Sequence, residues 1–263
     1  MKRYARGFTL IEIAIVLVII GLLLGGVLKG QELITGARVR NMISQQDGIK
    51  AAFFGFQDRY RALPGDYAAA DTNISCGATP CAKGNGNGRI ESASTPINAS
   101  VTHEETLVWS HLTSAGFLNG SYTFADTAAT DANTPKNPYG SLLDLENDQQ
   151  YGQGTGPLKH NLKTGAQIPV EIVAEVDRKI DDGLPYSGAF QFSTYAAAGG
   201  TPPVATGAQG CIDTAATPIV WAVRSGSTNC GAGYPVLILP FMATSRNALM
   251  HANRFGARLL ASA

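Results

Sequence analysis

An apolar run near the N-terminus that contains one acid constrains this chain more than any other feature. The run extends from Phe8 to Leu28, and Glu12 is its only charged residue. Its length is close to the roughly 20 apolar residues that a membrane-spanning helix needs. A carboxylate at mid-depth in a bilayer costs roughly 2.5 to 3.5 kcal/mol on insertion scales. We therefore predict a membrane-spanning helix in which the Glu12 side chain has a partner.

The flanking residues predict how this helix lies in a membrane. Three basic residues and no acid precede the run: Lys2, Arg3 and Arg6. By the positive-inside rule the N-terminus is cytoplasmic, and the chain after Lys29 lies outside the inner membrane. A removable secretory signal would have an apolar region of about 7 to 15 residues and a small-x-small cleavage site. The apolar run continues on both sides of Gly25 and Gly26, its only suitable small residues, so retention as an anchor is favoured over removal.

The N-terminal motif resembles that of a known family. Gly7 precedes Phe8, an acid follows at Glu12, and an uninterrupted apolar stretch continues from Ile13 to Gly21. This pattern is similar to the class III signal of type IV pilins and type II secretion pseudopilins. The resemblance implies that a membrane enzyme, the prepilin peptidase, cuts between Gly7 and Phe8, and that Phe8 is then N-methylated. It also implies other pilin or pseudopilin subunits as partners, together with the inner membrane.

Cleavage would give Glu12 the partner that its burial requires, because Phe8 would then carry a free, positively charged amine. A helix rises 1.5 Å per residue, so a neighbouring subunit displaced by about one turn brings its Phe8 amine beside Glu12. Removing one partner of a buried ion pair typically costs about 3 to 5 kcal/mol. Phe8 and Glu12 are therefore predicted to set the register of assembled subunits. The alternative is an ordinary single-pass anchor whose Glu12 extends toward the cytoplasmic face, and the Gly-Phe-(x)3-Glu spacing favours assembly.

The helix is expected to continue well beyond the membrane. No proline occurs before Pro64, so a helix from Phe8 to about Arg61 is predicted. Its second half carries an apolar stripe at steps of three and four, with Gln46 in the one polar place: Val39, Met42, Ile49, Phe53, Phe56 and Tyr60. This stripe is typical of a coiled-coil seam or of a face that packs on the chain's own head. Its aromatic C-terminal end favours the head.

We divide the chain into a leader at 1–7, a long helix at 8–61, with 8–28 as the transmembrane or filament-core part, and a head at 62–263. The expected fold class is α+β, similar to type IV pilins, with the long helix packed on an antiparallel sheet. In the head we expect a long loop at 68–100 and short helices at 103–118 and 169–180. Strands are expected around 122–124 and at 189–195, 218–224 and 234–241.

Four cysteines, an even number, suit an oxidising compartment outside the inner membrane. Cys76 and Cys81 are predicted to form one disulfide, because no further ligands for a metal lie nearby. Cys211 and Cys230 are predicted to form the other, which would contribute about 3 kcal/mol by chain entropy. In pilins such a loop often forms an exposed, partner-binding edge. Residues 211–230 are therefore either a recognition region or a purely structural disulfide loop.

Three polar segments are candidates for chemical sites. The stretch 84–91, GNGNGRIE, has oxygen-bearing residues at alternate positions. It lacks the opening Asp and the Glu at position 12 of an EF-hand loop, so a turn is favoured. Calcium binding by this segment stays an open possibility. His103 and His111 do not have the zincin spacing, which favours core packing of their helix. Asp181 and Asp182 are adjacent and are expected to diverge, which argues against paired acid–base catalysis. No catalytic residue, metal site or cofactor is predicted, apart from that open possibility of calcium.

The sequence as a whole indicates a structural subunit and not an enzyme. Lys+Arg and Asp+Glu both number 20, and no basic patch interleaved with aromatics suggests nucleic acid at the head. The function that we expect is a subunit of a type IV pilus or a type II secretion-like pseudopilus, minor or specialised because 263 residues is large for a bulk pilin. It would be a single-pass protein of a bacterial inner membrane with a periplasmic head, and part of a filament after assembly. The alternative is a membrane-anchored periplasmic binding or enzyme domain.

Overall fold

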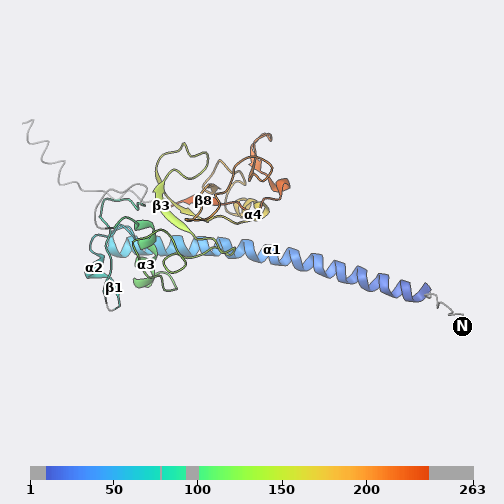
Figure 1. The fold of residues 1–263 in the computed structure, drawn as a ribbon, viewed down its shortest axis with the longest axis horizontal. Coiled ribbons are helices and arrows are strands. Elements are labelled where there is room, and N and C mark those ends of the chain that lie inside the picture. The colour runs from blue at the N-terminus through green and yellow to red at the C-terminus, as the bar shows by residue number, and fades with distance from the viewer. Residues whose placement is uncertain (1–9, 78, 93–100, 237–263) are drawn as a thin grey trace, which may run out of the picture.

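One long helix sets the shape of the molecule. The computed structural model describes residues 10–77, 79–92 and 101–236. In it α1 extends without a break from Leu10 to Tyr60, because no proline or strained turn interrupts the run. The helix ends where Arg61 takes a left-handed conformation, φ 54°, just before Pro64 and Gly65. Figure 1 shows that the head covers only the C-terminal part of α1, while the N-terminal part projects alone.

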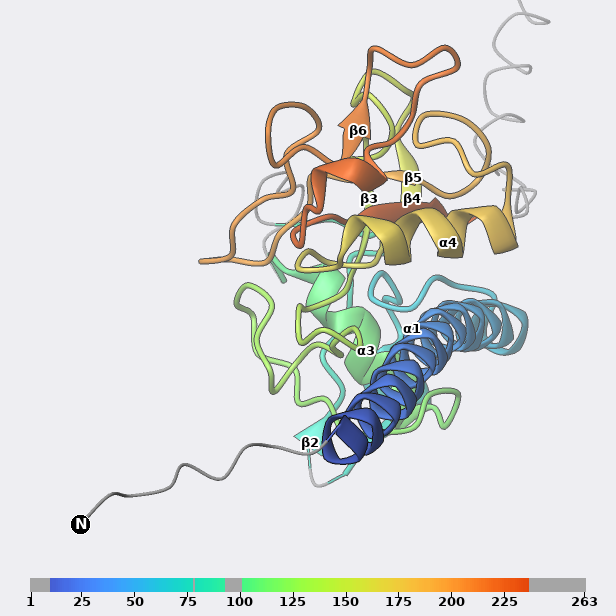
Figure 2. The same cartoon turned by 90° about the vertical axis from the view of Figure 1, so that its right-hand side faces the viewer.

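The head is built on a four-stranded antiparallel sheet. Its strands follow the order β3-β4-β8-β5, and their bounds are Asp144–Asp148, Lys159–Lys163, Ala232–Pro235 and Gln191–Phe192. Two longer helices accompany the sheet, α3 at Glu104–Ser114 and α4 at Val170–Ile180. Figure 2 looks nearly along α1 and shows α4 above that helix, with the strands above α4. The predicted α+β fold, a long N-terminal helix on an antiparallel sheet with short extra helices, is confirmed.

Short elements and two disulfides complete the head. They are α2 at Ala70–Asn73, the ribbon of β1 at Ser75–Cys76 with β2 at Thr79–Pro80, the ribbon of β6 at Ile212–Asp213 with β7 at Val220–Trp221, and a 3₁₀ turn, η1, at Val223–Ser225. Disulfides join Cys76 to Cys81 and Cys211 to Cys230. Among the described residues no cysteine is free.

The apolar stripe of α1 contributes to two hydrophobic clusters. In the first, Phe53 and Phe56 pack with Trp109 of α3 and Leu162 of β4. In the second, nearer the membrane end, Val39 and Met42 pack with α4, with Phe190 and Phe192, and with the Cys211–Cys230 disulfide. The stripe is therefore the face on which the chain's own head packs, as its aromatic end indicated. Gln46 is fully buried within it.

The hairpin of β3 and β4 was not predicted and is held by a buried charge network. Lys163 is fully buried, and its Nζ lies 2.7 Å from Asp144 Oδ2, 3.3 Å from Glu146 Oε2 and 2.5 Å from Asp148 Oδ2. Burial alone would lower the pKa of Lys163, but the three carboxylates outweigh it and raise that pKa above its ordinary value. The three acids lie on β3 and Lys163 lies on β4, directly opposite Asp144. The ion pairs therefore favour this register of the two strands.

Several expected strands need correction. The segment 122–124 is not a strand, and 218–224 contains only the two residues of β7 before the chain turns into η1. The segment 189–195 contributes only the two residues of β5. The expected strand 234–241 begins earlier, as β8, and its part after residue 236 lies outside the described residues. The expected loop 68–100 contains α2 and the β1–β2 ribbon, since the Cys76–Cys81 disulfide closes a tight hairpin there.

Candidate assembly surface on α1 and polar clusters of the head

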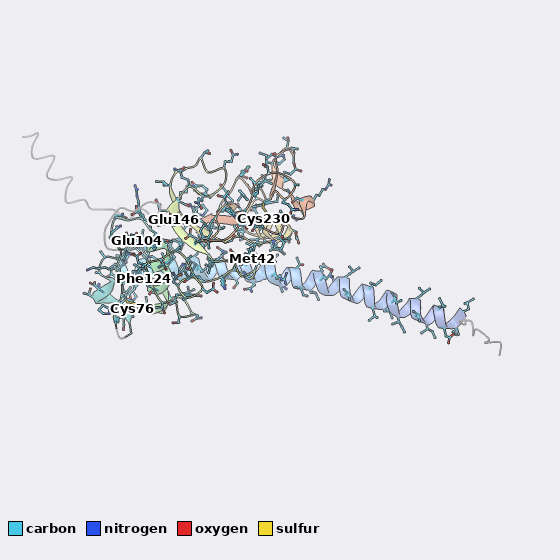
Figure 3. The ribbon with its side chains drawn as sticks, viewed as in Figure 1. Met42, Cys76, Glu104, Phe124, Glu146 and Cys230 are labelled. Carbon is cyan, nitrogen blue, oxygen red and sulfur yellow. A yellow bond between two sulfur atoms is a disulfide. The ribbon has the colours of Figure 1, made fainter. Side chains whose placement is uncertain are left out.

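The N-terminal half of α1, residues 10–38, has no contact with the head that buries a side chain. Every large apolar side chain from Leu10 to Ile34 is between 46% and 88% exposed, and the first buried residue is Val39. Figure 3 shows side chains projecting from both edges of this part of the helix, and the head begins near Met42. Burying apolar surface gains roughly 25 cal/mol per Å², so this half of the helix is a strong candidate for burial in lipid or between subunits.

A membrane segment fits this helix by length and composition. Within the described part of the chain, α1 is the one helix that is long and apolar enough to cross a bilayer, and none of the side chains in its apolar window is buried. Its apolar residues surround the whole circumference and do not form a stripe, which is typical of a helix in lipid or in a protein core.

Glu12 lies in the first turn of α1. A carboxylate near the N-terminus of a helix is stabilised by the helix dipole. The proposed cleavage site Gly7–Phe8 and the proposed methylated residue Phe8 lie outside the described residues. The geometry between the Phe8 amine and Glu12 thus stays a prediction, based on the rise of about 6 Å for four helical residues.

The Gly/Asn segment 84–91 wraps around two buried acids. The Gly86 and Asn87 N–H groups donate to Asp66 Oδ1, and the Gly88 N–H donates to Asp66 Oδ2 at 2.7 Å. The Asn85 N–H donates to Glu104 Oε1 at 2.9 Å. Burial raises the pKa of Asp66 to about 6 and that of Glu104 to about 7. The loop thus solvates carboxylates with backbone amides, a turn-like role, and calcium at this loop stays a prediction.

The two histidines of the α3 region make separate contacts. His103 Nδ1 lies 2.6 Å from Glu105 Oε1 at the start of the helix. The Gly65 N–H donates to Nδ1 of His111, whose Nε2 donates to the Ala82 carbonyl. His111 is therefore neutral with its proton on Nε2, and burial lowers its pKa to about 4. This histidine fixes two chain segments to α3.

Asp181 and Asp182 do not diverge as expected. Carboxylate oxygens of both lie within 4.8 Å of one another and of an oxygen of Asp177, a residue that the sequence analysis did not single out. Asp177 lies on α4 one turn before Asp181. The spacing of four residues, which places two side chains on the same helix face, is the sequence signal that could have identified Asp177 as a member of the cluster. The extended backbone of Asp181, φ −146° and ψ −142°, turns the pair back toward the helix.

The candidate recognition region 211–230 forms part of a surface pocket. The disulfide at its ends is buried, while a pocket of about 650 Å³ opens beside the β6–β7 ribbon, lined by Ile212, Trp221 and Arg224 among others. The Cys211–Cys230 disulfide is thus buried and the β6–β7 ribbon is accessible. Whether the segment is a recognition region or a purely structural disulfide loop stays a prediction.

Comparison with known proteins adds one finding. Residues 2–28 match the family description "Prokaryotic N-terminal methylation motif". No curated protein and no solved structure matches the chain significantly. The matched residues include Gly7 and Phe8, where cleavage is predicted, together with Glu12 and the exposed apolar part of α1 as far as Leu28. The N-terminal segment of this chain is the type IV pilin and pseudopilin signal.

Proposed function

We propose that this protein is a structural subunit of a type IV pilus or a type II secretion-like pseudopilus, assembled into a helical filament through the exposed half of α1. The observation that supports this most strongly is the coincidence of the methylation motif at residues 2–28 with an all-round apolar helix that the head leaves exposed. A membrane accepts such a surface before assembly, and neighbouring subunits accept it afterwards.

The chemistry of assembly rests on a pair that processing creates. The prepilin peptidase cuts between Gly7 and Phe8, Phe8 is methylated, and its amine keeps a positive charge. The amine of one subunit then pairs with Glu12 of its neighbour in an apolar surrounding, where an unpaired charge costs several kcal/mol. Misregistered subunits leave both charges unpaired, so the pair selects one axial offset.

We assign the protein a minor or specialised place in the filament, because its head carries features that a uniform shaft does not need. These are the pocket at the β6–β7 ribbon and a chain of 263 residues. The ratio of this subunit to the major one, measured by mass spectrometry of purified filaments, tests that assignment. A protein that makes up most of the filament mass contradicts it.

Mass spectrometry of the mature protein tests the processing step. We expect an N-terminus at Phe8 carrying one added methyl group. An N-terminus at Met1 in a strain with an active peptidase contradicts the proposal and favours an ordinary membrane-anchored periplasmic domain.

Substitution of Glu12 tests the assembly step. Glu12→Gln removes the charge with little change in shape, and we expect a processed subunit that stays in the membrane fraction and is absent from sheared filaments. Glu32→Gln is the matched control, because Glu32 lies on the same exposed half and its ion pair with Lys29 is exposed to solvent. Equal incorporation of both variants would contradict the role of Glu12.

A further inference from the structure

We propose that Asp177, Asp181 and Asp182 bind a calcium ion at the C-terminal end of α4. One carboxylate oxygen from each lies within 4.8 Å of the other two. Calcium–oxygen distances are about 2.3 to 2.6 Å, so two ligands on opposite sides of the ion lie about 4.8 Å apart. A spacing of this size is compatible with all three oxygens binding one ion. The site is separate from the assembly surface, and this inference does not rest on the proposed function.

The turn after α4 is built to hold two of the three carboxylates. The Ala189 and Phe190 N–H groups both donate to Asp181 Oδ2. The Leu184 N–H donates to Asp182 Oδ1 at 2.9 Å, and the Ser187 hydroxyl donates to Asp182 Oδ2. These bonds fix the orientation of both side chains before any ion binds, which lowers the entropy cost of binding.

A glycine makes this turn possible. Gly188 has φ 72°, and a Cβ atom at this position would lie 1.9 Å from Asp181 Oδ2. Glycine is therefore the residue that allows the carboxylate to approach the backbone so closely. The chain uses a special backbone conformation to bring Asp181 back toward α4.

An unsatisfied oxygen points to a missing ligand. Asp177 is fully buried, and its Oδ2 accepts a hydrogen bond from Trp221 Nε1 at 2.7 Å. Its Oδ1 is also buried and has no hydrogen-bond partner within the described ranges. A buried acceptor without a donor is destabilising, and a cation beside it removes that penalty.

The local charge points the same way. In the described part of the chain no basic side chain forms an ion pair with any of the three acids; Arg178 and Lys179, which follow Asp177, both pair with Glu175 instead. Asp181 and Asp182 place two further carboxylates beside Asp177. A divalent cation would compensate the accumulated negative charge.

The donor set selects the class of ion. All three side chains offer carboxylate oxygens, without the nitrogen or sulfur ligands that favour zinc or copper. Calcium accepts six to eight oxygens in irregular geometry, whereas magnesium requires a near-ideal octahedron at about 2.0 to 2.1 Å. Three carboxylates from one helical turn and the adjoining loop, completed by water, suit calcium better.

Binding would tie three parts of the second core cluster together. Asp177 connects α4 to Trp221 of β7, inside the Cys211–Cys230 loop. Asp181 connects the same helix end to the turn that leads into β5. Because α4 also packs on α1, the ion would stabilise the side of the head that faces the exposed half of that helix.

Calcium titration of the full-length chain in detergent tests the inference. We expect one bound calcium by isothermal titration calorimetry, with an affinity in the range of about 10⁻⁴ to 10⁻³ M that is typical of extracellular sites. We also expect calcium to raise Tm, because an ion that binds only the folded state stabilises it. The fluorescence of Trp221 provides a local signal, since its indole contacts Asp177.

Two matched variants locate the site. Asp182→Asn keeps an oxygen for the Leu184 N–H but removes a charge from an exposed position, so the fold should survive while calcium affinity falls roughly tenfold or more. Glu175→Gln lies on the same helix outside the cluster and should bind calcium like the unchanged protein. Asp66→Asn tests the Gly/Asn loop instead.

Three results would overturn the inference. They are no calcium-dependent rise in Tm of the unchanged protein at millimolar calcium, an equal response of Asp182→Asn and the unchanged protein, and loss of binding in Asp66→Asn but not in Asp182→Asn. An equal response to magnesium would overturn the choice of calcium.

Discussion

The two halves of α1 have the same backbone and opposite surroundings. From Leu10 to Arg38 no side chain is buried, whereas from Val39 onward every third or fourth residue is buried under the head. As far as Leu28 the first half is apolar on all sides except at Glu12, whereas the second half confines its apolar residues to one stripe. The distribution of apolar residues around a helix, more than their number, therefore indicates whether the helix lies in an apolar surrounding or packs one face on a domain.

Within the second half of α1, two neighbouring aromatic residues differ in burial. Phe53 is fully buried in the first core cluster, whereas Phe54, whose ring lies edge-on to that of Phe53, is 37% exposed. Phe53→Ala should lower the free energy of unfolding of the head by about 3 to 5 kcal/mol, because it removes a packed ring and leaves a cavity. Chemical denaturation of the full-length chain in detergent measures this.

Phe54→Ala is the control for that experiment. It removes the same atoms from the exposed side, and the expected loss is below about 1 kcal/mol. Similar losses for the two variants would mean that the stripe does not define the packed face.

Acid should remove the contribution that neutral His111 makes to the stability of the head, without affecting the exposed half of α1. The pKa of His111 is lowered to about 4 in the folded state, while unfolded histidine titrates near 6.5. At this residue the unfolded chain binds more protons between these pH values. The contribution of His111 to stability is therefore present above pH 6.5 and is lost as the pH falls toward 4. The shift corresponds to about 3 kcal/mol.

His111→Gln isolates this contribution. Its amide can accept from the Gly65 N–H and donate to the Ala82 carbonyl, and it does not titrate. The difference in unfolding free energy between His111→Gln and the unchanged protein should therefore shift in favour of the variant on going from pH 7.5 to pH 4. A difference that does not change with pH would contradict the assignment of the neutral histidine.

The smallest expected effects come from two glycine substitutions, one in each half of α1. A Cβ at Gly25 meets nothing within 4 Å, whereas a Cβ at Gly55 would lie 2.9 Å from the ring of Phe117. Gly25→Ala should stabilise the exposed half by about 1 kcal/mol, seen as slower amide hydrogen exchange there, with unchanged stability of the head. Gly55→Ala should destabilise the head. If Gly25→Ala changed the stability of the head, the two halves would not be independent.

The sequence was informative where the structure depends on local pattern. The long helix, its stripe from Val39 to Tyr60 and the helices near 104–114 and 170–180 all follow from periodicity and from proline positions. The membrane-like half and its acid follow from composition alone. These features need no information about distant parts of the chain.

The β3–β4 hairpin shows why other features could not be predicted. Its strands read DLEND and KHNLK, which lack β-branched and aromatic residues. Their stability comes from contacts between residues far apart in sequence, above all Lys163 with the acids of β3. The cluster at Asp177 depends likewise on a turn that brings Asp181 and Asp182 back to the helix, and single-sequence patterns do not report such a turn.

The ten residues between Leu28 and Val39 have a consequence for how the head meets the membrane. With residues up to Leu28 in the hydrocarbon layer, the stretch 29–38 rises about 15 Å before the first buried contact of the head. The headgroup layer of one leaflet is only about 5 to 7 Å thick. The head would then stand clear of the lipid on a stiff stalk, where two anchored subunits can meet sideways and rotate into register before either leaves the bilayer.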